Sequence, residues 1–370
     1  MASPPSPARP WLLAFAAPAG ESDPERLVAG AQHAATLDLL DRARESRAFE
    51  RIALVTPVRD LAERAPRNVL LEGVEGGFSF GERLAALIRK HRLERPFYAG
   101  GGSGVFMSAQ DWRDAAALLE RSEQTLVTNN LYSADLLGFH PGSAIERVPL
   151  PDADNPLAQA LRHAGLTPVE LPRTLATQFD IDTPTDVLAL AVHPHTPPGT
   201  RAFIEAQSLD TSRVERLLPL LTDQDAEIVV AGRVGSAAWS FLEARTACRV
   251  RLFSEERGMR ADGRDQRGEA RSLLAYHLEQ VGARRFFQEL ARLGQAALID
   301  TRVILAHFGL DLPPRDRFAS DLGRPEEIAD PFLCAFTEAA LDASIPVLLG
   351  GHSLVSGGLM ALTDAAWLRR

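Results

Sequence analysis

Short apolar runs alternate with amphipathic stretches along the first half of the chain. Apolar runs bounded by turn residues predict buried strands, which we place at residues 11–15, 51–56, 68–71, 96–99, 124–128 and 167–171. Apolar positions three and four residues apart predict helices, which we place at residues 34–46, 80–92, 108–120 and 184–192. Strands that alternate with helices are typical of a mainly parallel, doubly wound sheet. We therefore expect an α/β domain over residues 10–192, preceded by a disordered Pro/Ser-rich tail at residues 1–9.

A Pro- and His-rich stretch at residues 193–200 reads as a linker, and the alternating pattern starts again after it. Strands are predicted at residues 227–231, 249–254, 296–300 and 345–349. Helices are predicted after Ser236, near 269–281 and 283–293, at 331–341 and after Ser353. We expect residues 201–370 to form a second, smaller Rossmann-like α/β domain, whose role the pattern does not specify.

Composition narrows the class of protein. A length of 370 residues favours two domains, and a net charge of -9 argues against a nucleic-acid binder. No apolar window approaches the ~20 residues of a membrane span, so we expect neither a membrane nor a nucleic-acid partner. The cysteines Cys248 and Cys334 have no metal-site spacing, which fits a reducing compartment. We expect a cytoplasmic protein of bacterial type, and its oligomeric state is not predicted.

Two familiar chemistries are disfavoured by the sequence. Lys90 is the only lysine and lies in a polar run, whereas a Walker-type phosphate loop and a Schiff base each need a placed lysine. Gly351-His352-Ser353 is reminiscent of a hydrolase nucleophile elbow, but no histidine follows Ser353. A hydrolase triad is therefore not expected.

The most informative stretch is Phe-Asp-Ile-Asp-Thr-Pro-Thr-Asp-Val at residues 179–187. Two acids two residues apart on a strand point the same way, so Asp180 and Asp182 could supply two carboxylate ligands to Mg²⁺. The stretch then turns into a helix that Thr183 caps and Pro184 begins. A helix cap with solvated acids is the other interpretation of the same residues.

This stretch resembles the D-I-D-T-P-E-D-L closing motif of the molybdopterin-guanylyltransferase-like and phospholactate-guanylyltransferase-like families. The order of elements over about residues 10–192 is similar as well, which covers roughly half of the chain. The resemblance implies a nucleotide-diphospho-sugar transferase fold. It also implies Mg²⁺, held by Asp180 or Asp182, that bridges nucleotide phosphates during nucleotidyl transfer.

The sequence departs from those families at two places. They open with a Gly-rich loop and a lysine, whereas only Arg26 could hold phosphate here. They end the fourth strand in G-D-x-P, whereas this chain has Gly100, Gly101, Gly102 and Ser103. Backbone amides of such a loop can still cradle an anion, although a tight turn is the alternative reading. Asn129 and Asn130 end the neighbouring strand, where they could orient an acceptor.

The second half contains its own candidate anion site. A strand–glycine–helix turn over residues 232–236 is followed by an arginine- and glycine-rich loop over residues 254–269 that suits a flexible clamp on phosphate. A solvated, self-neutralising loop is the alternative. The candidates converge from predicted strand ends and are Gly232, Arg233, Gly235, Ser236, Arg257, Arg260, Arg302, His352 and Ser353.

Three hypotheses follow from the sequence. The first is a nucleotidyltransferase-like enzyme that binds a nucleotide or phosphorylated metabolite with Mg²⁺. The second is a non-catalytic binding or regulatory protein that has kept the fold without the usual motifs. The third places the site in the arginine-rich second half.

Overall fold

The computed structural model describes residues 9–73, 79–152 and 156–370. The chain divides into two compact units. Unit 1 comprises residues 1–18 and 32–178, and unit 2 comprises residues 19–31 and 179–370. This boundary differs from the expected linker at residues 193–200. That stretch lies inside unit 2, where Arg201 donates to the carbonyls of His193 and Pro194, both at 2.8 Å.

Unit 1 is built on a seven-stranded sheet with the order β3-β2-β1-β4-β6-β5-β7. Six strands run parallel, and β6 runs antiparallel to both of its neighbours. The strands are β1 (Trp11–Phe15), β2 (Arg51–Thr56), β3 (Leu70–Gly73), β4 (Pro96–Ala99), β5 (Thr125–Thr128), β6 (Leu136–His140) and β7 (Thr167–Glu170). The sequence pattern did not predict β6, which pairs with β5, the strand before it in the chain, and with the more distant β4.

Alternation along the strands of unit 1 builds a core on each face of the sheet. In β1, Leu12 and Ala14 pack in one cluster, whereas Leu13 and Phe15 pack in the other. Helices therefore cover both faces, as in other doubly wound sheets. They are α1 (Asp23–Ser46), α2 (Arg59–Arg64) and α4 (Ala109–Glu120) on one face, and α3 (Phe80–His91), η1 (Gly142–Arg147) and α5 (Leu157–His163) on the other, with the short α6 (Leu175–Gln178) near the end of the unit. The first turns of α1 are assigned to unit 2.

Unit 2 is built on a four-stranded sheet with the order β11-β10-β8-β9, in which every strand runs parallel. The strands are β8 (Glu227–Gly232), β9 (Arg249–Ser254), β10 (Ala296–Asp300) and β11 (Val347–Gly350). The expected α/β class is confirmed in both units. The sheet of unit 2 is the smaller one, but the unit itself holds the larger share of the chain.

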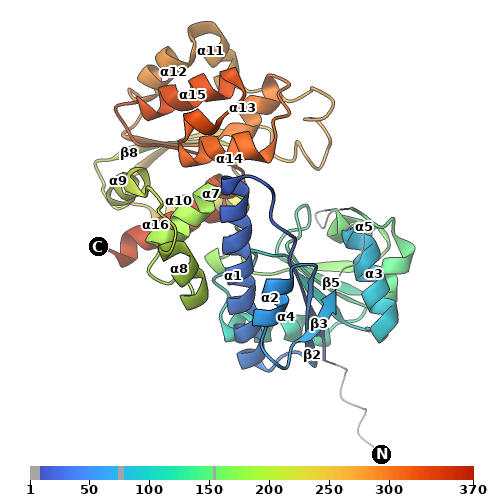
Figure 1. The fold of residues 1–370 in the computed structure, drawn as a ribbon. Helices are drawn as coiled ribbons and strands as arrows, with labels where there is room; N and C mark the ends of the chain where they lie inside the picture. The colour runs from blue at the N-terminus through green and yellow to red at the C-terminus, as the bar shows by residue number, and fades with distance from the viewer. Residues whose placement is uncertain (1–8, 74–78, 153–155) are drawn as a thin grey trace, which may run out of the picture. The chain divides into compact units, whose positions relative to one another are not determined.

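Helices cover both faces of this second sheet as well (Figure 1). An aromatic-rich core that includes Phe286, Phe287 and Phe336 lies under one layer of helices. That layer is α11 (Leu273–Val281), α12 (Ala283–Leu290), α13 (Thr301–His307), α14 (Pro314–Leu322) and α15 (Pro331–Leu341), with η2 (Pro325–Glu327) beside it. The remaining helices are α7 (Pro184–Val192), α8 (Pro198–Glu205), α9 (Ser212–Leu221), α10 (Ser236–Arg245), η3 (Ser353–Val355) and α16 (Gly357–Leu368).

Helix α7 belongs to unit 2, although the sequence pattern assigns it to the first domain. Its Thr185 hydroxyl donates to the carbonyl of Leu349 in β11 at 2.6 Å. The helix also contacts α14 and α16. These partners lie far along the chain, so the local pattern of apolar residues could not assign α7 to its sheet.

Candidate functional site

Three neighbouring strands of unit 2 end in register at their carboxyl ends. Asp300 of β10 is paired with Gly350 of β11, and Ile299 before it is paired with Ala231 of β8. Asp300 consequently lies beside Gly232, so closely that a Cβ atom on Gly232 would be 2.3 Å from the Asp300 Cβ. Open parallel sheets bind ligands outside this edge. The loops that follow the strands are therefore the place to look for a site.

The loop after β8 is held by a buried ion pair. Arg233 donates from Nε to Asp300 Oδ2 at 2.6 Å and from Nη2 to Oδ1 at 3.0 Å. Burial alone would raise the pKa of Asp300, but the Arg233 guanidinium holds that pKa below its ordinary value. The pair fixes the guanidinium of Arg233 at the carboxyl edge.

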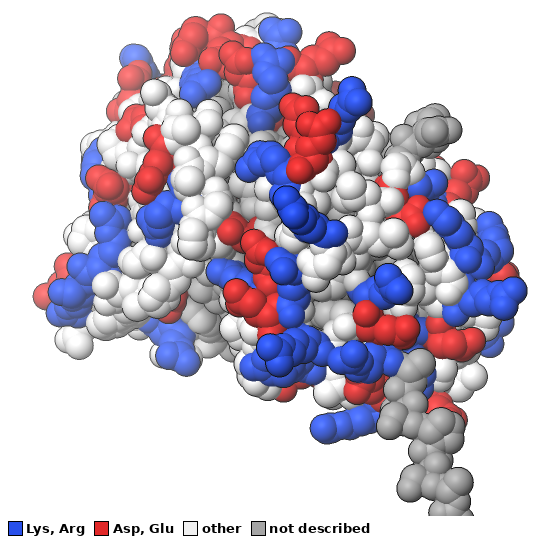
Figure 2. All heavy atoms as spheres, turned by 60° about the horizontal axis from the view of Figure 1, so that its bottom comes forward, with Lys and Arg blue, Asp and Glu red and all other residues white. Residues whose placement is uncertain are grey.

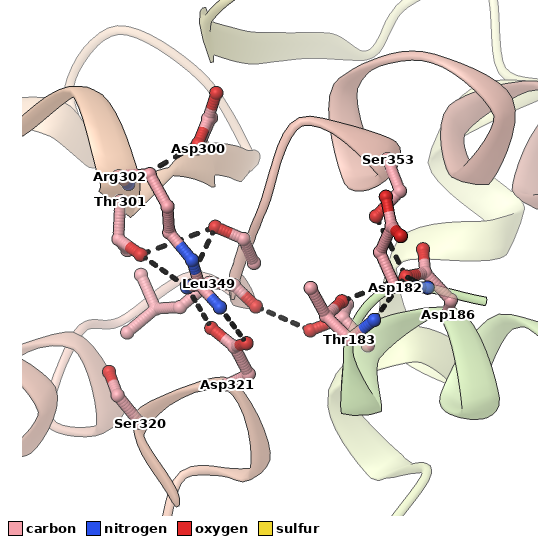
Figure 3. A network of polar contacts seen from close by, with 12 residues as sticks. Asp182, Thr183, Asp186, Asp300, Thr301, Arg302, Ser320, Asp321, Leu349 and Ser353 are labelled. Atoms are coloured by element: carbon pink, nitrogen blue, oxygen red, sulfur yellow. Dashed lines mark hydrogen bonds and ion pairs between the residues drawn. The ribbon is translucent and has the colours of Figure 1, made fainter. Parts of the chain in front are cut away.

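A second buried pair, formed by Arg302 and Asp321, lies near Asp300 (Figure 3). Arg302, in the first turn of α13, donates to both carboxylate oxygens of Asp321 in α14 at 2.7 and 2.6 Å. It also donates to the Gly350 carbonyl at 3.2 Å. Burial alone would lower the pKa of Arg302, but the Asp321 carboxylate raises it. Arg302 therefore ties α13, α14 and β11 together as a cation.

The arginine-rich loop after β9 is not the flexible clamp that its composition indicates. Two successive turns have the same hydrogen bonds, and each closes on a glycine with positive φ, Gly263 and then Gly268. In the first turn Arg264 N donates to Met259 O, and in the second Glu269 N donates to Arg264 O, both at 2.8 Å. This is the backbone pattern of a Schellman cap used twice. These hydrogen bonds therefore define the backbone of the loop.

Within this loop, Arg257 is exposed and makes no hydrogen bond or ion pair to any residue that the structure describes. Its guanidinium carbon would lie 3.6 Å from a Cβ atom built on Gly235, so it sits over the turn before α10. A helix begins at Ser236, and backbone amides at such a start attract anions. An unpaired guanidinium and a helix start thus face the same small region.

His352, in the loop after β11, lies near the same cations. Burial lowers the pKa of His352, and the charges of Arg233 and Arg257 lower it further, whereas Asp300 and Asp182 oppose that effect. The imidazole is therefore neutral at pH 7. We call the Gly232–Ser236 turn, Arg233, Arg257 and His352 the edge site.

Asp180 and Asp182, which were expected at the end of a strand, lie in no sheet. Asp180 is half-buried, and its Oδ1 accepts from the amide of Ile181 at 3.0 Å. Asp182 is exposed, and its charge acts on His352 and Asp186. The expected i, i+2 alignment of the two acids is therefore not what the structure shows.

The third acid of the same motif, Asp186, is the one that is fully buried. Its Oδ2 accepts from the Thr183 amide at 2.8 Å, the Thr183 hydroxyl at 2.9 Å and the Ser353 hydroxyl at 2.7 Å (Figure 3). Its Oδ1 is buried and has no hydrogen-bond partner among the described residues. Burial raises the pKa of Asp186 to about 7, and the charge of Asp182 contributes to this rise. Ser353 is thus a partner of Asp186 and no free nucleophile.

The residues expected at the first site fall in both units. Arg26 belongs to unit 2, where it is paired with Asp23. In unit 1, Gly102 and Gly104 have positive φ, and the Ser103 hydroxyl donates to the Gly100 carbonyl at 2.8 Å, so the loop forms a tight turn. A Cβ atom on Gly101 would lie 3.0 Å from the Phe15 carbonyl, so the turn packs against the end of β1.

The two asparagines also have structural partners. The Asn129 amide donates to the Thr177 carbonyl at 3.1 Å and its Oδ1 accepts from Leu136 N at 3.1 Å. Asn130 Oδ1 accepts from Tyr132 N at 3.1 Å. The tight-turn interpretation therefore describes this region well.

The described residues provide only some of the ligands that a Mg²⁺ site needs. Among the residues that the structure describes, no group of three or more His, Cys, Asp or Glu side chains could hold a metal ion. Mg²⁺ is nevertheless bound in many proteins by one or two carboxylates together with substrate phosphates. Asp182, exposed and near His352, fits that mode only if a ligand supplies the other oxygens.

Sequence reasoning missed three charged residues at this edge: Asp186, Asp321 and Arg317. Asp186 was read as part of a motif, with no signal that it would be buried. Asp321 and Arg317 lie four residues apart on α14, a helix that the apolar pattern did not predict. The spacing of the two charges was the only available signal.

The face of the molecule in Figure 2 shows blue and red side chains interspersed, without a broad patch of one sign. No helix within the described ranges is both long enough and apolar enough to cross a bilayer.

No family model matches the chain, and no curated protein matches its sequence. Solved structures similar to it include a bifunctional IspDF from Campylobacter jejuni, at 13% identity and a TM-score of 0.34. That match covers 46% of this chain and 51% of the IspDF chain, about half of its length.

Two further similar structures match nearly the whole of their own chains. A cytidylyltransferase from Leptospira borgpetersenii has 12% identity and a TM-score of 0.38, over 54% of this chain and 93% of that one. A CMP:2-keto-3-deoxy-manno-octonic acid synthetase complexed with CTP has 11% identity and a TM-score of 0.32, over 48% and 94%. All three TM-scores lie below 0.5, so the proposals below rest on the residues of this chain.

Proposed function

We propose that the chain binds a phosphorylated small molecule at the edge site of unit 2. The observation that carries the proposal is the unpaired, exposed Arg257 over the glycine turn that begins α10. The guanidinium and the amides at the helix start would hold one phosphate group from two sides. Arg233 lies at the same turn, where Asp300 balances its charge and keeps its guanidinium ordered before a ligand binds.

The neutral imidazole of His352 gives this site a group that can accept a proton. A neutral histidine beside bound phosphate is suited to general-base chemistry on a hydroxyl or a water. We therefore favour an enzyme over a purely regulatory binder. The third hypothesis from the sequence, a site in the arginine-rich second half, is the one that the geometry supports best.

A thermal-shift screen tests the binding proposal. Phosphorylated metabolites and nucleotides would be added to the wild-type protein and to the Arg257→Ala variant. Arg292→Ala is the matched control, because Arg292 is exposed and precedes β10, at the opposite edge of the parallel sheet. We expect stabilisation of the wild type and of the control by a phosphorylated compound, and a smaller shift in Arg257→Ala. Equal shifts in all three proteins would contradict the proposal.

Nucleotide binding with Mg²⁺ is a second candidate, and one observation favours it. In unit 1, β1 lies between β2 and β4 and runs parallel to both. The chain continues from β1 to β2 and β3 on one side and then crosses to β4 on the other. The carboxyl ends of β1 and β4 therefore form a topological switch point, where open α/β sheets bind ligands. When bound, Mg²⁺ would neutralise phosphate charge. The acids expected to hold it, Asp180 and Asp182, belong to unit 2, so the metal ligands are a separate proposal for that unit.

The metal proposal has its own test. Thermal shifts with nucleoside triphosphates would be measured with and without Mg²⁺, in the wild type and in Asp182→Ala. We expect a Mg²⁺-dependent shift that Asp182→Ala removes, with Asp342→Ala, an exposed acid of unit 2, as the control. A thermal shift with a nucleotide that is the same without Mg²⁺ would contradict the metal proposal, but it would not contradict phosphate binding at the edge site.

A further inference from the structure

Arg317 is a cation for which the fold provides no partner. It is half-buried in α14, one helical turn before Asp321. Its Nε atom is buried and has no hydrogen-bond partner among the described residues, and no ion pair to its guanidinium is found there either. An unpaired buried charge is costly, so proteins seldom keep one without a use for it.

Other cations gather around Arg317, and the nearest buried carboxylate is already engaged. Asp321 is held at both oxygens by Arg302. Burial lowers the pKa of Arg317 to about 10, and repulsion from Arg302 and Arg260 contributes to that fall. The charges of Asp321 and Asp311 oppose that fall, but among the described residues neither acid forms an ion pair with the Arg317 guanidinium.

Arg260 is brought there by the packing of its neighbour. Met259 is buried against Val303 and Ala306 of α13, which fixes the loop after β9 on that helix. The side chain of Arg260 stays 74% exposed, and its nearest acid, Asp265, lies 3.9 Å away. It is consequently free to turn toward a ligand.

We propose that Arg260 and Arg317 form a second anion subsite, so that the ligand carries two anionic groups, two phosphates or a phosphate and a carboxylate. One group would bind at Arg257 and the Gly232–Ser236 turn, and the other at Arg260 and Arg317. The two-group ligand class rests on the proposed function, whereas the subsite itself rests on Arg260 and Arg317.

The test compares thermal unfolding in chloride buffer with unfolding in inorganic phosphate at equal ionic strength. The variant Arg317→Met keeps the length of the side chain and removes its charge. Because it removes an unpaired buried cation, we expect it to unfold about 2 °C or more above the wild type in chloride. In phosphate we expect the wild type to gain more than the variant, since only the wild type has both subsites.

Arg315→Met is the matched control, because Arg315 lies on the same helix with its side chain 59% exposed. It should behave as the wild type in both buffers. Should Arg317→Met fail to fold, Arg260→Ala replaces it, since Arg260 is exposed and its loss leaves the core intact. Arg260→Ala should likewise reduce the phosphate shift.

The phosphate shifts of the Arg317 and Arg257 variants distinguish the second subsite from the edge site. A full phosphate shift in Arg317→Met, or in its substitute Arg260→Ala, would overturn the second subsite, while a reduced shift in Arg257→Ala would still uphold the edge site. A full shift in Arg257→Ala with a reduced shift in Arg317→Met would uphold the second subsite and overturn the edge site. Reduced shifts in both variants, and none in the double variant, are the result that we expect.

Discussion

Arg233 and Asp300 face each other from the ends of neighbouring parallel strands, joined by hydrogen bonds of 2.6 Å and 3.0 Å. The main-chain amides of Arg233 and Arg302 also donate to this carboxylate, at 3.3 and 3.2 Å. Asp300 thus organises the start of two loops at once. The pair fixes the Arg233 guanidinium at the carboxyl edge, with its charge balanced by the Asp300 carboxylate.

Removal of the Asp300 charge should destabilise the protein strongly. Asp300→Asn leaves Arg233 buried without a counter-charge, and breaking a buried pair in this way costs roughly 3–5 kcal/mol. Urea unfolding followed by circular dichroism measures the loss. Asp342→Asn, whose exposed carboxylate lies 3.9 Å from Arg284, is the control and should unfold as the wild type does. Equal midpoints for the two variants would show that the Arg233–Asp300 pair is unimportant.

Gly232 should be intolerant of any side chain. It has a φ of +129°, and its Cβ position lies 2.3 Å from the Asp300 Cβ. Gly309 has a positive φ as well, but open space around it, so Gly309→Ala isolates the backbone strain of about 1–2 kcal/mol. Gly232→Ala should cost a further ~1–3 kcal/mol because the Asp300 Cβ, and the backbone of β10 that carries it, must move. Similar unfolding energies for the two variants would contradict this close approach.

The buried carboxyl of Asp186 predicts a pH dependence of stability. Its pKa is raised from 3.8 to about 7, so the folded protein binds a proton that the unfolded chain has released. Stability from this group is therefore complete below pH 4 and is lost as the pH rises toward 7, by on the order of 4 kcal/mol. Asp186→Asn, which keeps an acceptor for Thr183 and Ser353, should flatten the profile over that range.

The measurement is the free energy of unfolding in urea at several pH values between 4 and 8, in the wild type and in Asp186→Asn. The difference between the two proteins isolates Asp186 from the other titrating groups. A difference that does not change with pH would mean that Asp186 is ionised in the folded protein throughout, and that the raised pKa is wrong.

His352 should make anion binding stronger in acid. Its pKa is lowered by burial, and it faces Arg233, Arg257, Asp300 and Asp182, so it gains a proton only below its ordinary range. Protonation adds a positive charge to the edge site, and affinity for an anion should then rise. Sulfate is the suitable probe because it does not titrate here. The rise should be absent in His352→Asn, and its persistence there would assign it to another group.

The sequence predicted the elements well and their long-range partners poorly. Strands β1 and β2 lie at the apolar runs that predicted them. The capping box of Ser108 and Asp111 at the start of α4 also forms as predicted. These features depend on local residues alone.

The candidate site depends on pairs that no local pattern reveals. Arg233 and Asp300 are 67 residues apart in the chain, and Asp186 and Ser353 are 167 apart. Convergence at strand ends could be predicted, since parallel strands share one carboxyl edge. Which acid would be buried, and which arginine would be left unpaired, could not.

The central claim is that Arg257 and the glycine turn before α10 hold a phosphate group. Isothermal titration of inorganic phosphate into the wild type, Arg257→Ala and Arg292→Ala tests it most directly. We predict binding in the wild type and in Arg292→Ala, with an affinity about tenfold lower in Arg257→Ala, as expected for the loss of a charge-assisted hydrogen bond of ~1.5 kcal/mol. Identical isotherms for all three proteins would contradict the claim.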